Sequence, residues 1–237
     1  MPMSSARSSN SSANWRRETA EGQGCLSSYA IPPMLALVVG ISFLVFLTRF
    51  SPEEDASAMT AGLGNAFNGV NSRSISSIFT PEIQHWEPQI IRWAAEYNLD
   101  PNLVATVMQI ESCGNPDAIS SAGAMGLFQV MPFHFTAWDN PFDPDTNARR
   151  GMAYLQRSLI AAGGDPGLAL AGYNGGISII SKPQSQWADE TLRYLYWGEG
   201  IYTDATSGAP ESARLNEWLS RASGMCSRAR EKLKISE

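Results

Sequence analysis

The chain has few of the residues that build metal centres or nucleic-acid surfaces. Among its 237 residues are 3 cysteines and 2 histidines, and no Cys-x-x-Cys motif is present. His85 and His134 stand alone in the sequence, so we expect structural or surface roles for both. Lysines and arginines form no block, and the formal net charge is -6. We therefore expect no metal, no cofactor and no nucleic-acid partner.

The sequence also lacks alternating apolar and polar runs, so no β-strand is predicted. Apolar residues recur instead at helical spacing, bounded by Asp-Pro starts and glycine stops. The predicted helices cover residues 81–98 (kinked or split at Pro88), 101–112, 147–162, 166–174, 189–197 and 210–222. We expect an all-α globular domain from about residue 80 to 237.

One long uncharged run lies near the N-terminus. Residues 1–30 are polar and rich in serine, which predicts disorder. Ile31 to Leu47 contains no charge and would span about 25 Å as a helix. With Thr48 included it predicts a single transmembrane helix at residues 31–48. Residues 49–79 lack an apolar period and predict a flexible linker.

The charges around this run predict its orientation. Three arginines precede it, whereas one arginine follows it before an acidic cluster at residues 53–55. The positive-inside rule then puts the N-terminus in the cytoplasm and the predicted domain outside, anchored to a bacterial membrane. The alternative is a cleaved signal peptide, because Ala56-Ser57-Ala58 has the form of a cleavage site.

An extracytoplasmic location changes the interpretation of the cysteines. Cys113 and Cys226 would both face an oxidising space, where disulfides persist. A bridge between them would contribute about 4 kcal/mol and would hold the C-terminal segment next to Glu111. Two free thiols are the alternative.

Glu111 is the most unusual carboxylate in the chain. It follows Val104, Val107 and Met108 by seven, four and three residues, which places all four side chains on one helical face. Burial on an apolar stripe raises a carboxyl pKa, and the negative end of a helix acts in the same direction. A carboxylic acid that stays protonated near neutral pH suits glycosidic-bond cleavage. A solvated glutamate at a helix end is the alternative.

Three further segments carry polar residues in unusual settings. Gln129 lies inside the apolar turn GLFQV and either satisfies backbone groups or reaches a cleft. Tyr173 and Asn174 precede two glycines that permit close backbone approach or simply end a helix. Glu190, one turn before Tyr194, either serves a site or complements the helix dipole.

In this order and spacing, the segments resemble the lytic murein transglycosylases of the SLT type, which have a goose-lysozyme-like fold. The resemblance covers residues 82–197 and rests on four segments, IESCGNPDAISSAGAMGLFQVMP, FDPDTNARRGMAYL, AGYNGG and ETLRY. Phe128 stands where the family usually has Met, and Gly172 where it usually has Ala. Residues 198–237 match nothing in the family.

The resemblance implies a peptidoglycan substrate and one catalytic residue, Glu111. Glu111 would protonate the β-1,4 bond between N-acetylmuramic acid and N-acetylglucosamine, then accept the C6 hydroxyl proton as a 1,6-anhydro ring closes. Tyr173 would orient Glu111. The implied substrate-binding residues are Ser112, Ser120, Ser121, Gln129, Tyr173, Asn174, Glu190 and Tyr194. Ser112 has a second interpretation as a helix-end cap.

Two other functions remain open at this stage. A hydrolase on the same scaffold would use water, activated by a cleft carboxylate such as Asp117, Asp139 or Asp143. A non-catalytic envelope module would bind peptidoglycan without cleaving it.

Overall fold

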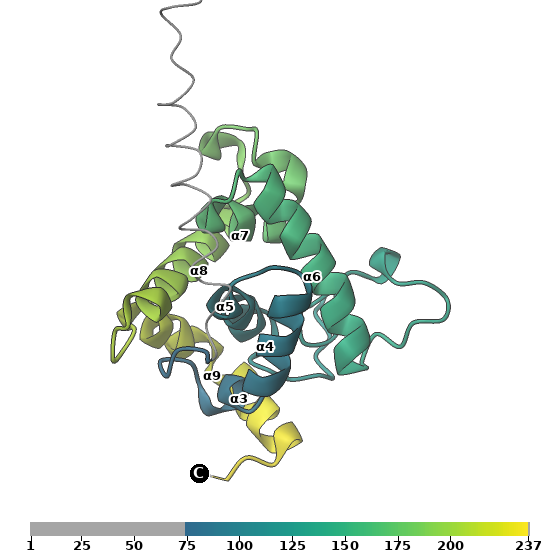
Figure 1. Ribbon diagram of the computed structural model, residues 1–237, viewed down its shortest axis with the longest axis vertical. Coiled ribbons are helices and arrows are strands. Elements are labelled where there is room, and N and C mark those ends of the chain that lie inside the picture. Colours follow the sequence, from purple (N-terminus) through teal and green to yellow (C-terminus); the bar gives the residue numbers. More distant parts are fainter. Residues whose placement is uncertain (1–73, 237) are drawn as a thin grey trace, which may run out of the picture. The chain divides into compact units, whose positions relative to one another are not determined.

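The computed structural model describes residues 74–236 (Figure 1). The predicted disordered segment, the predicted transmembrane helix and most of the predicted linker lie outside these residues. Within residues 74–236 the fold is helical and contains no strand, as expected. The helices are α3 (Pro81–Gln84), α4 (Glu87–Glu96), α5 (Pro101–Ser112), α6 (Pro144–Ala161), α7 (Pro166–Gly175), α8 (Asp189–Ser207) and α9 (Ala213–Leu233). Short 3-10 helices cover Pro132–His134, Ile177–Ile179 and Gln184–Gln186.

Helix α5 lies at the centre of the fold, in contact with α3, α4, α8 and α9 (Figure 1). Its apolar residues Leu103, Val104, Val107 and Met108 are almost completely buried. Each such side chain stabilises the folded state by about 1.5–3 kcal/mol relative to leaving it in water. Packing in the core therefore fixes the position of α5, and with it the backbone that carries the side chains at its C-terminal end.

Three helices begin with the same Asp-Pro pair. The side chain of Asp100 accepts a hydrogen bond from the Asn102 backbone at 2.8 Å, and Asp143 and Asp165 cap α6 and α7 in the same way. The start of α6 had been predicted at Asn147, three residues late, because the Asp143 cap was not recognised as a start signal. The predicted break at Pro88 is confirmed, since α3 ends at Gln84 and α4 begins at Glu87.

Helices α8 and α9 are longer than predicted. Helix α8 continues past its predicted end and includes Gly198. A Cβ at this position would lie 3.0 Å from the Leu170 side chain, so the glycine allows α7 and α8 to pack closely. Helix α8 ends instead at Gly208, whose φ is 73°. Helix α9 runs to Leu233, well past the predicted end at residue 222.

One boundary expectation was wrong for a physical reason. The end of the predicted linker belongs to the fold, because Ile75 and Phe79 are buried in the core. In the segment after Pro132, Phe133 is 74% exposed and Trp138 is 95% exposed, whereas Phe135 packs against the core. The ion pairs of Asp139 with Arg149 and Arg150 also hold this segment.

Helix α9 is attached to the rest of the fold by covalent and ionic contacts. Cys113, directly after α5, and Cys226 of α9 form a disulfide with their Cα atoms 5.0 Å apart. Arg230 donates a hydrogen bond to the buried carboxylate of Glu82 at 2.6 Å. In addition, Lys232 pairs with Asp117 in the loop after α5. These contacts fix the C-terminal helix beside the end of α5.

Within residues 74–236, every helix is too short or too polar to cross a lipid bilayer.

The disulfide allows a stability prediction. Cys113→Ser/Cys226→Ser should unfold at lower denaturant concentration, with a loss of about 4 kcal/mol, because the bridge restrains a loop of 113 residues in the unfolded chain. Urea unfolding measures the loss. A reducing agent should bring the wild type to the level of the double variant and leave the double variant unchanged. Equal stability of both proteins under oxidising conditions would contradict this account.

Candidate active site

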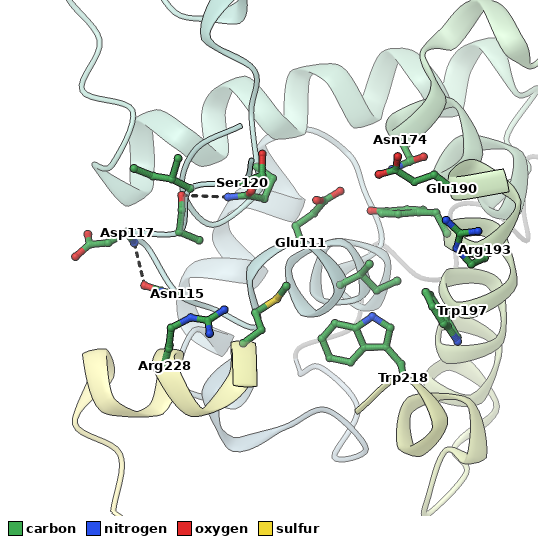
Figure 2. Close-up of a pocket in the computed structure, with 16 residues that line it drawn as sticks. Glu111, Asn115, Asp117, Ser120, Asn174, Glu190, Arg193, Trp197, Trp218 and Arg228 are labelled. Carbon is green, nitrogen blue, oxygen red and sulfur yellow. Dashed lines mark hydrogen bonds between the residues drawn. The ribbon is translucent and has the colours of Figure 1, made fainter. Parts of the chain in front are cut away.

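Glu111 projects from the last turn of α5 into a cavity of about 500 Å³ (Figure 2). Its helical stripe is as predicted, since Val104, Val107 and Met108 are all buried. Glu111 itself is only partly buried, because its side chain reaches the cavity. Figure 2 shows Asn174 and Glu190 on one side of the Glu111 carboxyl and Ser120 on the other.

The electrostatics of this position favour a neutral carboxyl group. The pKa of Glu111 is raised to about 8, chiefly because burial disfavours the charged form. The nearby Tyr194 hydroxyl lowers the pKa, whereas the charge of Glu190 raises it. At neutral pH most of the Glu111 population therefore holds a proton. Glu111 is thus equipped to donate a proton to a group that enters the cavity.

Ser112 organises the loop that follows α5. Its hydroxyl donates a hydrogen bond to the Leu127 carbonyl at 2.7 Å and accepts one from the Gly114 backbone at 3.1 Å. Ser112 is completely buried and does not line the cavity. The structure therefore gives Ser112 a structural position at the helix end, the second of its two sequence-based interpretations.

The turn that contains Gln129 is anchored on α6. Asn147 of α6 accepts a hydrogen bond from the Phe128 backbone at 2.9 Å and donates to the Met125 and Pro141 carbonyls at 2.8 and 2.9 Å. No role for Asn147 was predicted from the sequence. A buried polar residue on the apolar face of a predicted helix is the signal that could have identified it.

Gln129 lines the cavity in a left-handed backbone conformation, with φ of 46°. Its amide nitrogen donates to the Ala118 and Gly126 carbonyls at 3.1 and 3.0 Å. These bonds close the loop around the cavity, so Gln129 satisfies backbone groups and also reaches the site.

The two tyrosines differ in their contacts. Tyr173 donates its hydroxyl proton to the Phe128 carbonyl at 2.7 Å, so it supports the Gln129 turn, whereas a bond to Glu111 was expected. Tyr194 lines the cavity with Glu111, as expected for a site residue. Its hydroxyl is buried near the Glu111 carboxyl, whose pKa it lowers, and makes no hydrogen bond within residues 74–236.

The cavity brings together most of the predicted site residues. Those that line it are Glu111, Ser120, Gln129, Asn174, Glu190 and Tyr194. A second cavity, of about 240 Å³, also includes Gln129 and Asn174 and is where Tyr173 is found. Ser121 is exposed and lines neither cavity. Asn174 accepts a hydrogen bond from Thr191 at 2.9 Å, which couples α7 to α8 beside Glu111.

Several residues of the cavity wall were not predicted from the sequence. These additional lining residues are Ile110, Asn115, Ala118, Ile119, Arg193, Trp197, Trp218, Met225 and Arg228. Asp117, considered above as a cleft carboxylate, also lines the cavity. Trp218, Met225 and Arg228 belong to α9, in the part of the chain where no resemblance was found. The expected bridge from Cys113 to Cys226 was the one signal that placed this segment near Glu111.

No group of His, Cys, Asp and Glu side chains in residues 74–236 is arranged to hold a metal ion.

The raised pKa of Glu111 makes a prediction about stability. As pH rises from about 4.5 to about 8, the unfolded chain loses its Glu111 proton while the native protein keeps it, so the wild type loses stability. The free energy of unfolding of Glu111→Gln relative to the wild type should therefore increase across this range. At higher pH the difference between the two proteins should stay constant. Urea unfolding at about pH 4 and about pH 9 measures the change. Glu231→Gln, which changes an exposed glutamate, is the control. The assignment would be contradicted if the stability difference between Glu111→Gln and the wild type did not change with pH, or changed only as much as that of Glu231→Gln.

Comparison with known proteins supports the family resemblance. Residues 88–193 match the model of the transglycosylase SLT domain family. A transglycosylase of Enterobacteria phage PRD1 is 42% identical over 114 residues, which is 47% of this chain and 40% of the phage protein. The membrane-bound lytic murein transglycosylase C of Actinobacillus succinogenes is 27% identical over 176 residues, covering 65% of this chain and 49% of the relative.

A third relative is the membrane-bound lytic murein transglycosylase E of Buchnera aphidicola, 30% identical over 139 residues, with 52% of this chain and 61% of the relative covered. The chain spans about half the length of the curated relatives it matches. The matched span contains Glu111 and every predicted site residue up to Glu190. Residues 88–193 therefore resemble the transglycosylase SLT domain family, the family that the sequence motifs indicated.

Proposed function

We propose that the chain is a peptidoglycan lytic transglycosylase that cleaves the β-1,4 bond between N-acetylmuramic acid and N-acetylglucosamine. The observation that carries the proposal is the Glu111 carboxyl, raised in pKa to about 8 and exposed to a cavity within the matched domain. The names of the curated relatives, lytic murein transglycosylases, give the substrate class.

In the proposed reaction Glu111 acts twice. Its carboxylic acid protonates the glycosidic oxygen as the bond to the muramyl C1 breaks, and the N-acetyl group of the substrate stabilises the positive charge on the sugar. The resulting Glu111 carboxylate then takes the proton of the muramyl C6 hydroxyl, whose oxygen bonds to C1 and closes the 1,6-anhydro ring. Glu111 ends the cycle protonated, so no water is consumed.

The neighbouring residues are proposed to bind the substrate. Ser120, Gln129 and Asn174 offer hydrogen-bonding groups along the cavity and are assigned to the sugars. Glu190 and Tyr194 flank Glu111, and the unpartnered Tyr194 hydroxyl is suited to stabilise the carboxylate that forms during the reaction. Tyr173 is assigned an indirect role, through its bond to the turn that carries Gln129.

The carboxylates considered for a hydrolase are engaged elsewhere. Asp139 pairs with Arg149 and Arg150, and Asp143 caps α6. Asp117 lines the cavity but pairs with Lys232. These engagements favour the C6 hydroxyl over an activated water as the nucleophile.

The proposed location is the outer face of a bacterial membrane. The disulfide between Cys113 and Cys226 supports an oxidising compartment. The names of the relatives include "membrane-bound", which supports attachment to a membrane. We propose that residues 31–48 provide it as a single-pass anchor, with a peptidoglycan-facing domain beyond the linker.

Products of purified peptidoglycan test the reaction. Wild-type full-length protein should release fragments with 1,6-anhydro-muramyl ends, identified by mass spectrometry. Glu111→Gln should slow their release by at least about a hundredfold, the usual contribution of a positioned acid or base. Reducing-end fragments from the wild type would identify a hydrolase, and binding without any fragments would identify a non-catalytic module.

Glu190→Gln is the matched control, because it removes a second carboxylate from the same cavity. It should keep the anhydro end group, since Glu190 is not assigned to proton transfer. Loss of all product in Glu190→Gln together with normal turnover in Glu111→Gln would show that the acid had been assigned to the wrong residue.

A further inference from the structure

One wall of the Glu111 cavity comes from outside the matched SLT span. Trp218, Met225 and Arg228 of α9 line it, at positions 7 and 3 residues apart that share one face of the helix. Trp218 is buried, whereas Met225 is partly exposed and Arg228 is exposed. The wall therefore combines an apolar surface with one accessible positive charge. That charge, on Arg228, lies on the Asp117 side of Glu111 (Figure 2).

This wall is held in a fixed position relative to Glu111. Cys226, between Met225 and Arg228, is bonded to Cys113, two residues after Glu111. Arg230, on an adjacent face of α9, donates a hydrogen bond to Glu82 of α3. A helix fixed in this way does not have to be ordered when a ligand binds, which lowers the entropic cost of binding to this wall.

Arg228 has no hydrogen bond or ion pair within residues 74–236, although an acidic residue lines the same cavity. That residue, Asp117, pairs with Lys232, one turn further along α9. Lys232 thus neutralises one carboxylate of the cavity lining. The Arg228 guanidinium is left to interact with a ligand.

The chemistry of a guanidinium selects the ligand class. Arginine binds carboxylates through two parallel hydrogen bonds, a geometry that lysine does not offer. In peptidoglycan, carboxylates occur on the lactyl arm of the muramyl unit. The lactyl carboxyl is free in strands stripped of peptide, and in intact strands it is joined to a peptide that has carboxylates of its own.

We infer that the α9 wall binds the lactyl arm of a muramyl unit, with Arg228 paired to a carboxylate on that arm and Met225 against its apolar groups. This inference rests on the proposed function, because it takes peptidoglycan as the substrate. It extends the site beyond the SLT domain and makes α9 a determinant of which strands are accepted.

The test is equilibrium binding of fluorescent peptidoglycan fragments to full-length Glu111→Gln, with and without Arg228→Ala. Three fragments are compared: peptide-bearing, peptide-stripped, and peptide-bearing with all carboxyls converted to amides. Arg228→Ala should weaken binding of a carboxylate-bearing fragment about fivefold, the size of one accessible ion pair. A loss with the peptide-bearing fragment assigns the peptide carboxylates, and a loss with the stripped fragment assigns the lactyl carboxylate.

Arg221→Ala is the matched control, since Arg221 is an exposed arginine of the same helix outside the cavity lining. It should bind all three fragments like its parent. The inference fails if Arg228→Ala matches Arg221→Ala on both charged fragments, or if its loss is as large with the amidated fragment. Because binding is measured without turnover, this result is independent of whether the wild type yields anhydro products.

Discussion

The site depends on one constraint, a carboxyl group held at the end of a buried helix where its charged form is disfavoured. Helix α5 contacts α3, α4, α8 and α9, and its apolar face ends at Glu111. Burial of that face fixes the backbone, and partial burial of Glu111 itself raises its pKa. The same packing that stabilises the fold thus sets the protonation state on which the proposed chemistry depends.

Two supports keep the cavity open around this carboxyl. On one side, Asn147 of α6 and Tyr173 of α7 hold the turn that presents Gln129. On the other side, the Cys113–Cys226 disulfide holds α9 against the loop after α5. The first support lies within the matched span, whereas the second joins Cys113 within that span to Cys226 outside it.

Much of this architecture could be predicted from sequence. The Asp100-Pro101 start, the apolar stripe before Glu111 and the glycine stop of α7 are local signals, and helices formed where they indicated. Periodicity placed Glu111 on the buried face of its helix, with a solvated glutamate at the helix end as the alternative. Most of the predicted cavity residues were found by motif, because their spacing along the chain reflects a shared family arrangement.

Side-chain partners across the fold were harder to predict. Ser112 and Tyr173 were assigned to substrate and to Glu111, yet both hydroxyls donate to backbone carbonyls of the same turn. Arg228 was not identified at all, because its place in the cavity depends on how α9 packs over α5. Sequence spacing encodes neither a hydrogen-bond choice nor the position of a helix 100 residues away.

The most direct test of the account is the pKa of Glu111 in the full-length protein. Carboxyl-carbon NMR of glutamate-labelled wild type, with Glu111→Gln to identify the resonance, follows this one group through a pH titration. The account predicts a midpoint near pH 8. A midpoint near about 4.3, the value of an unperturbed glutamate, would contradict it and remove the basis for Glu111 as the acid.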